Sequence, residues 1–131
     1  MLNNITIQGR LARDPELKHT SGGHAVTSFT IACERNYQQN GEKITDWVTI
    51  VAWRNLAERI CKYWSKGKEI VVTGSLESRK YTDKTGAQRT TWEVKASDAF
   101  FTNRERQEVQ EFNQDTEYNF SQITDDADLP F

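Results

Sequence analysis

Residues 47–53 read Trp-Val-Thr-Ile-Val-Ala-Trp, and this stretch decides how the rest of the chain is interpreted. Alternation with a period of two and β-branched content predict a strand, because successive side chains of a strand point to opposite faces. One predicted face is aliphatic and consists of Val48, Ile50 and Ala52. The other carries Trp47 and Trp53, so it offers two tryptophans to solvent or to a partner while the aliphatic face forms core.

The same alternation predicts strands on both sides of this segment. The further strands are expected at residues 5–7, 27–33, 70–81 and 89–99. Gly74 allows the fourth strand to bend, and the turn-forming residues 82–86 join the fourth strand to the fifth.

A helix is predicted over residues 55–65, between the third and fourth strands. Asn55 is expected to cap it with Glu58 in a capping box, and Gly67 to stop it. Its apolar face consists of Leu56, Ile60 and Tyr63 or Trp64. Three strands, a helix and two strands are the order of a five-stranded Greek-key barrel of the OB type, which is an all-β fold.

The charge divides the chain at about residue 103. Residues 1–103 carry 15 Lys and Arg against 11 Asp and Glu, whereas residues 104–131 carry 2 against 8. The second segment has too little apolar area to offset chain entropy, so we expect it to be disordered. We therefore predict a domain at 1–103, a flexible linker at 104–124 and an acidic tip at 125–131.

The sequence pattern excludes membrane-spanning and secreted proteins and disulfide or zinc sites. No run of about 18 apolar residues predicts a membrane span, and the N-terminal residues lack the regions of a signal peptide, so we expect a cytoplasmic protein. Cys33 and Cys61 lack metal-ligand spacing and are expected to be small, buried and reduced.

Catalytic and cofactor signatures are also missing from the sequence. His19 and His24 lie in a loop rich in Gly, Ser and Thr, and no nucleophile has a base at a suitable spacing. The aspartates at 125–128 lack the pattern of a calcium loop, and no Walker or dinucleotide motif is present. We expect no enzyme activity, no metal and no cofactor.

Aromatic residues stand beside Lys or Arg on the predicted solvent faces. Single-stranded nucleic acid fits this pairing, because bases stack on rings, for about 1–3 kcal/mol each, and phosphates need cations. The stacking candidates are Tyr37, Trp47, Trp53 and Tyr81. The candidate phosphate contacts are Arg10, Arg35, Lys43, Arg54, Arg79, Lys80, Lys84 and Arg89. For Arg10, and for Arg13, a structural role in the first turn is the alternative.

The aromatic residues have a second interpretation, as cover for apolar surface or as an oligomer interface. This second interpretation is favoured for Trp64 on the helix, which is expected to cover apolar surface or to lie in an interface. Trp92 shares a face with Val94 and Ala96, so it is expected in the core or in an interface. The stacking interpretation is favoured for Trp47 and Trp53, because their strand already has a core face.

Seven segments, taken in order, resemble the bacterial or phage single-stranded DNA-binding protein family. They are Asn-Asn-Ile-Thr-Ile-Gln-Gly-Arg-Leu-Ala-Arg-Asp-Pro-Glu (3–16), Phe-Thr-Ile-Ala (29–32), Thr-Asp-Trp-Val (45–48), Asn-Leu-Ala-Glu (55–58), Lys-Gly-Lys (66–68), Gly-Ser-Leu-Glu-Ser-Arg-Lys-Tyr-Thr-Asp (74–83) and Asp-Asp-Ala-Asp-Leu-Pro-Phe (125–131). The resemblance implies an OB barrel, a homotetramer, and stacking on the same four aromatic residues. The linker departs from the family pattern, being short, charged and almost free of Gly and Pro.

The tip combines negative charge with an apolar end, which suits a small pocket rimmed by Arg or Lys. Its residues are Asp125, Asp126, Asp128, Leu129, Pro130 and Phe131. The resemblance implies docking of replication, recombination and repair proteins there, in the bacterial cytoplasm and nucleoid or in a phage-infected host. We therefore expect a sequence-tolerant protein that coats and protects single-stranded DNA and recruits enzymes. An OB module for RNA or oligosaccharide, and a metal-dependent nuclease, are the rival hypotheses.

Overall fold

The computed structural model describes residues 1–102. Its longest strands, β3 (Ala25–Gln39) and β4 (Glu42–Trp53), form one antiparallel hairpin. The turn between them is Asn40-Gly41, with φ of 54° and 78°. Positive φ at both central residues is the geometry of a type I′ turn, which matches the twist of the flanking strands. This hairpin extends well beyond the strand predicted at residues 27–33.

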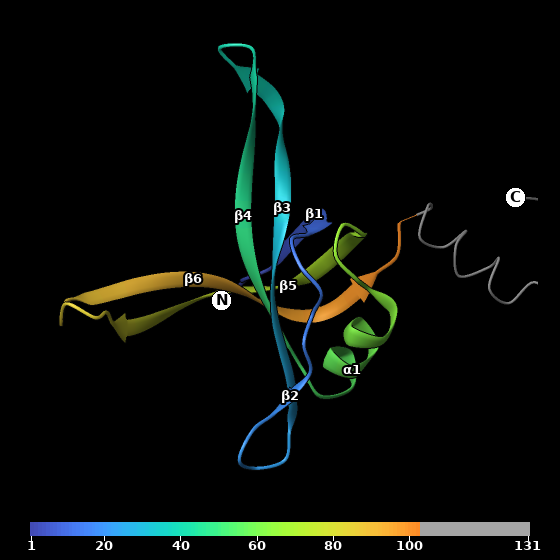
Figure 1. Cartoon of the computed structure of the whole chain (residues 1–131), viewed down its shortest axis with the longest axis vertical. Helices are drawn as coiled ribbons and strands as arrows, with labels where there is room; N and C mark the ends of the chain where they lie inside the picture. The colour runs from blue at the N-terminus through green and yellow to red at the C-terminus, as the bar shows by residue number, and fades with distance from the viewer. Residues whose placement is uncertain (103–131) are drawn as a thin grey trace, which may run out of the picture. The chain divides into compact units, whose positions relative to one another are not determined.

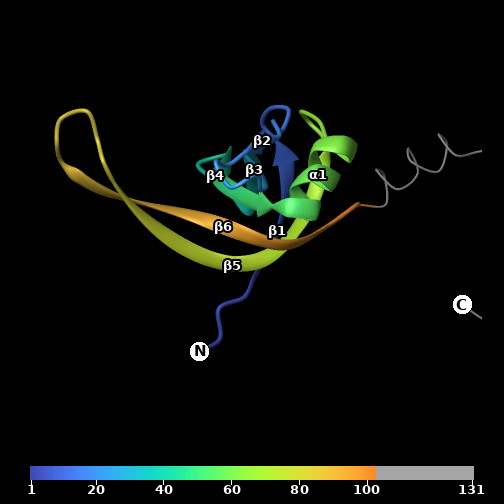
Figure 2. The same ribbon diagram turned by 90° about the horizontal axis from the view of Figure 1, so that it is seen from below.

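Five strands close into a barrel, which confirms the predicted OB architecture. The others are β1 (Ile5–Leu11), β5 (Glu69–Thr82) and β6 (Gln88–Phe100), and the sheet runs in the order β1-β5-β6-β4-β3 with β1 pairing back to β3. β6 lies parallel to β4. A two-residue strand that was not predicted, β2 (Lys18–His19), extends the sheet beside β3. The distal halves of the β3–β4 and β5–β6 hairpins project from the barrel as two arms (Figures 1 and 2).

The core is built from the aliphatic faces that the alternation predicts. Ile50 and Ala52 of β4 are fully buried, as are Phe29 and Ile31 of β3. Further fully buried side chains come from β1, α1, β5 and β6, namely Leu11, Ile60, Ile70, Val72 and Val94. The predicted core face of residues 47–53 is therefore confirmed at Ile50 and Ala52, whereas Val48 is half-buried.

The helix α1 (Arg54–Tyr63) follows β4 without a connecting loop. The predicted Asn55 cap is wrong, because the residue before the helix is Trp53, which has extended backbone and makes no side-chain cap. Ala57 and Ile60 are buried, and the next residue that packs inward is Trp64. Gly67 does not end the helix. Its φ of 86° forms the turn in which Lys68 N–H donates to the Ser65 carbonyl.

The bend predicted at Gly74 coincides with an irregularity in the sheet. The β5–β6 register shifts between Thr73 and Gly74, and a Cβ added at Gly74 would lie 2.0 Å from the carbonyl oxygen of Lys95. Only glycine permits this approach of two backbones. The close contact lies where the β5–β6 arm leaves the barrel.

Two smaller expectations are also informed by the structure. Cys33 and Cys61 are free thiols, half-buried rather than fully buried, and burial raises the pKa of the Cys33 thiol. Among residues 1–102, no helix is both long and apolar enough to cross a membrane.

Candidate nucleic-acid interface

One continuous sheet surface carries three of the four predicted stacking residues, and we call it the outer face. The face begins with Trp47, Thr49, Val51 and Trp53 of β4. β4 pairs in parallel with β6, and this pairing adds Glu93 and Lys95 to the face. β6 pairs antiparallel with β5, which adds Glu77, Arg79 and Tyr81. Residues paired directly across strands share a face. The outer face therefore joins Trp47, Trp53 and Tyr81.

Trp47 is the most exposed of the three aromatic residues on the outer face. Its side chain is 65% exposed, although Ile50 three residues along the strand is fully buried. Trp47 lines a groove of about 700 Å³ between β1 and the β3–β4 arm, together with Arg10, Asn36 and Thr45. An exposed indole next to a polar groove can stack on a base while leaving the base edge room for hydrogen bonds.

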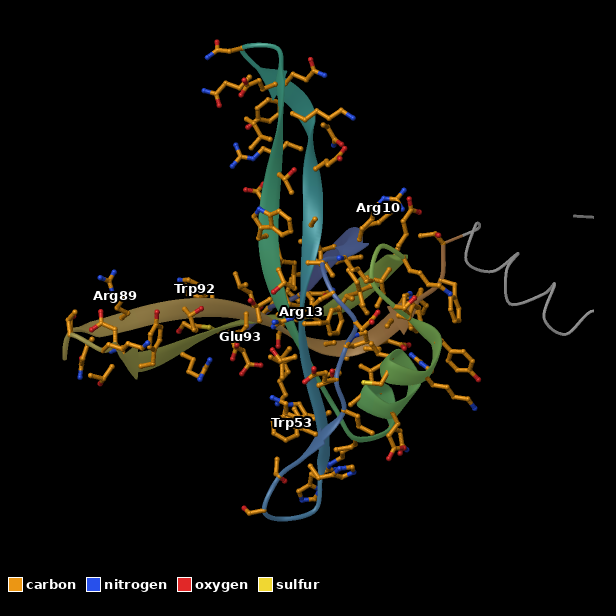
Figure 3. The ribbon with its side chains drawn as sticks, in the orientation of Figure 1. Arg10, Arg13, Trp53, Arg89, Trp92 and Glu93 are labelled. Atoms are coloured by element: carbon orange, nitrogen blue, oxygen red, sulfur yellow. The ribbon has the colours of Figure 1, made fainter. Side chains whose placement is uncertain are left out.

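Trp53 lies at the other end of β4, where the strand enters α1 (Figure 3). It is 39% exposed and pairs with Val26 of β3. Val26 also lines a second groove, of about 330 Å³, with Arg13 and Lys18. The two tryptophans are six positions apart, which corresponds to about 20 Å along the strand.

Tyr37 lies on the opposite face of the β3–β4 arm from Trp47. Its hydroxyl accepts a hydrogen bond of 2.9 Å from Arg35, and Arg35 is paired with Asp46. Asp46 lies between Thr45 and Trp47 in β4, so alternation directs it away from the outer face. The β3–β4 register shifts between Glu34 and Gln38 and adds residues to β3 next to Tyr37. The predicted set of four aromatic residues is therefore divided between two faces.

Tyr81 is held on the β5–β6 arm by a well-ordered turn. Asp83 accepts hydrogen bonds from Thr85 and from the Ala87 N–H, and its second oxygen accepts one from Arg89. These hydrogen bonds, led by that from the Thr85 hydroxyl, lower the pKa of Asp83 to about 2. Arg89 pairs with Tyr81 across the hairpin. The turn thus fixes the register at the end of the arm.

The predicted phosphate contacts fall into two groups. Five of them form ion pairs with carboxylates: Arg10 with Glu69, Arg35 with Asp46, Lys43 with Glu34, Arg79 with Glu93 and Arg89 with Asp83. Within residues 1–102, Arg54, Lys80 and Lys84 form no ion pair. A phosphate that binds one of the five paired cations must share it with a carboxylate or displace that carboxylate. At the three unpaired cations no carboxylate of the described residues competes with the phosphate.

Two of the predicted cations have additional structural roles. Arg10 donates to the carbonyl of Gly67 and to the Glu69 carboxylate, and thereby holds β1 against the start of β5. Arg54 has a φ of 59°, in the left-handed region that L residues rarely occupy. This backbone conformation turns the chain from β4 into α1 immediately after Trp53.

The two remaining tryptophans, Trp64 and Trp92, differ in their exposure. Trp64 is 3% exposed, and its indole N–H donates to the carbonyl of Glu69, so the prediction that it covers apolar surface is confirmed. Trp92 is 60% exposed, so of its two predicted places, the core and an interface, the core is wrong and the interface stays a prediction. Val94 is buried on the same side of β6, but at Trp92 the strand has already left the barrel for the arm (Figure 3). The register of the β5–β6 hairpin places Trp92 directly across from Ser78 and diagonal to Lys80.

The acidic tip predicted to dock partners, Asp125 to Phe131, and the whole predicted linker, residues 104–124, lie outside the described residues.

The chain is similar to known proteins over most of its length. The chain matches the family model described as the single-strand binding protein family over residues 2–102. It is 38% identical to the single-stranded DNA-binding protein of Caldanaerobacter subterraneus subsp. tengcongensis, covering 98% of this chain and 91% of that protein. It is 35% identical to single-stranded DNA-binding protein 3 of Clostridium acetobutylicum, and the match covers 99% of this chain and 100% of that protein. Single-stranded DNA-binding protein 3 of Streptococcus agalactiae is 34% identical over the whole of both chains.

Proposed function

Because the chain belongs to the single-strand binding protein family, we propose that it binds single-stranded DNA with little sequence preference. The family is one of binding proteins rather than enzymes, so no reaction on the strand is expected. The observation that carries the proposal is the 65% exposure of Trp47 on a strand whose opposite face is fully buried at Ile50 and Ala52. Core packing accounts for one face of β4 and leaves the tryptophans for a partner.

Binding in this proposal combines stacking with charge. Bases stack on Trp47, Trp53, Tyr81 and Tyr37, at about 1–3 kcal/mol per base, and stacking tolerates any base because each has a π-face. Phosphates contact the cations that were predicted from the sequence. A duplex hides the faces of its bases, so it can satisfy only the charged part of the surface.

A competition experiment tests the proposal. Fluorescently labelled oligo-dT is bound to the full chain, and unlabelled single-stranded DNA, RNA and duplex of equal length compete for it. We expect single-stranded DNA of mixed sequence to compete best and duplex to compete least. Stronger competition by RNA would favour the RNA module, and fragments of the labelled strand in the presence of magnesium would favour the nuclease.

We further propose that the chain protects exposed strands during replication, recombination and repair in a bacterium or its phage, and recruits partner enzymes through residues 125–131. The acidic residues of this tip suit a basic rim, and the terminal Phe131 suits an apolar pocket. Attaching the tip peptide to a surface and passing candidate replication and repair enzymes over it tests the recruitment. A peptide with Phe131→Ala is the matched control and should capture none of them.

The same tip is proposed to compete weakly with DNA for the basic surface. Deletion of residues 125–131 should then tighten oligo-dT binding at low salt and have less effect at high salt, because screening weakens the competition. Equal affinity of the two proteins at every salt concentration would contradict it. The family resemblance also supports a homotetramer, and sedimentation of the full chain at several concentrations tests that state.

A further inference from the structure

We propose that Trp92 is a fifth stacking site for single-stranded DNA, on the face of the β5–β6 arm opposite to Tyr81. The inference rests on the proposed function and extends it to a surface that the four predicted stacking residues do not include. It follows from the exposure of Trp92, the charges on its face and the arrangement of aromatic residues on both arms.

The exposure of Trp92 has no explanation in the packing of the described residues. Its side chain is 60% exposed, close to the value for Trp47, and Leu76 beside it is 38% exposed. Ser78 lies directly across the hairpin from Trp92. The indole therefore stands next to small and aliphatic side chains, which leave both its edge and its ring accessible.

The two faces of the arm differ in charge. The face with Tyr81 carries Glu77 and Glu93, and its arginines are already paired with carboxylates. The face with Trp92 carries no carboxylate among the described residues and one cation, Lys80. Lys80 pairs with Thr90, which makes it a diagonal neighbour of Trp92 at about 7 to 8 Å. A cation without a carboxylate partner beside an exposed indole complements a phosphate and its adjoining base.

The β3–β4 arm has the same arrangement of one aromatic residue on each face. Trp47 occupies the outer face of that arm, and Tyr37 the opposite face beside Arg35. On the β5–β6 arm the corresponding residues are Tyr81 and Trp92. A strand that follows both aromatic residues of an arm must pass around its edge, so the contact with Trp92 requires a longer oligonucleotide than the outer face alone.

Tryptophan emission can isolate this site. The chain has four tryptophans, and the double variant Trp47→Phe, Trp53→Phe keeps two, of which Trp64 is 3% exposed. Emission that acrylamide quenches in this variant therefore reports Trp92, and adding Trp92→Ala must abolish it. We expect long oligo-dT to quench the emission of Trp92 and to shield it from acrylamide.

A second measurement uses single substitutions in the full chain. Trp92→Ala is expected to weaken binding of long oligo-dT by roughly 5- to 100-fold, which corresponds to loss of one stacked base, and to affect a short oligo-dT less. Lys80→Ala should lower the salt slope by about 0.7, as expected for one phosphate. Tyr63→Ala is the matched control, because Tyr63 is an exposed aromatic residue on α1 with Lys62 over its ring.

The outcomes separate this inference from the proposed function. If oligo-dT binds the unsubstituted chain and Trp92→Ala binds it equally well, the fifth site is wrong and the function stands. If Trp92 is already shielded without DNA and becomes accessible on dilution, a second copy of the chain covers it, and the inference is overturned. If the unsubstituted chain does not bind oligo-dT, the proposed function itself fails.

Discussion

The carboxylate of Asp46 accepts two hydrogen bonds from the guanidinium of Arg35, from Nε at 2.8 Å and from Nη2 at 3.1 Å. The third donor of Arg35, Nη1, reaches the hydroxyl of Tyr37. The hydrogen bond from Arg35 lowers the pKa of Asp46 and raises that of Arg35, so both stay charged at neutral pH. A phosphate that approaches Arg35 therefore meets a carboxylate already in place.

Asp46→Asn is expected to tighten oligo-dT binding severalfold. The substitution removes the negative charge that competes with phosphate for Arg35, so one additional phosphate can be neutralised. The slope of log affinity against log salt should become steeper by about 0.7. Anisotropy titrations at four salt concentrations measure both quantities.

Asp98→Asn is the matched control for this prediction. Asp98 also pairs with an arginine, Arg59 of α1, but that pair lies away from the aromatic residues of both arms. The control should leave affinity and salt slope unchanged. Weaker binding by Asp46→Asn would show that Asp46 serves DNA binding by orienting Arg35 and Tyr37 instead of competing with phosphate.

Substitution by alanine should lower the stability of the fold at Ile50 and the affinity for DNA at Trp53, although both residues belong to β4. Ile50 is fully buried, so Ile50→Ala is expected to lower the free energy of unfolding by about 2–5 kcal/mol. Trp53→Ala should weaken DNA binding with little change in stability, because its side chain is 39% exposed. Urea unfolding and oligo-dT titration of both variants check this. An equal loss of stability in both would mean that the faces of β4 are wrongly assigned.

Arg54→Gly is expected to separate stability from binding. Glycine tolerates the φ of 59° in the folded protein, whereas this left-handed conformation costs other residues about 1–2 kcal/mol. Glycine also gives the unfolded chain more freedom, which cancels part of this gain in stability. Thermal unfolding should therefore show equal or greater stability, while oligo-dT binding weakens through loss of the cation. Arg54→Lys keeps the charge and should bind normally. Normal binding by Arg54→Gly would exclude Arg54 from the phosphate contacts.

The turn at the end of the β5–β6 arm should resist acid. The pKa of Asp83 is lowered from 3.8 to about 2, first by the hydrogen bond from Thr85. A lowered pKa means that the carboxylate stabilises the folded turn above about pH 4 and that this contribution is lost as pH falls toward 2. The amide resonances of Thr85 and Ala87 in an NMR titration should shift with a midpoint near 2. A midpoint near 3.8 would show that these hydrogen bonds do not hold the turn in solution.

The order of the elements and the two faces of β4 could be predicted from the sequence, because both depend on alternation within a strand. The proposal that bases stack on Trp47 and Trp53 rests on the same alternation. The helix cap could not be predicted in the same way, since β4 continues directly into α1 and leaves Asn55 inside the helix.

Contacts between different strands could not be predicted from the alternation within one strand. Arg10 and its partner Glu69 are 59 residues apart, so the pairing of predicted phosphate contacts with carboxylates depends on the closed barrel. Tyr37 lies on the opposite face from Trp47, next to a shift in register that no local signal marked. The core was one of the two places predicted for Trp92, and it is wrong because alternation identifies the side of a strand and not the point at which the strand leaves the barrel.

The central claim is that single-stranded DNA stacks on the exposed tryptophans within a cationic surface. Titration of intrinsic tryptophan fluorescence with oligo-dT, and with duplex of equal length, at two salt concentrations tests it most directly. We predict strong quenching by oligo-dT that weakens as salt rises, and little quenching by duplex. Absence of quenching and of binding would contradict the account and would assign the aromatic surface to contacts between proteins.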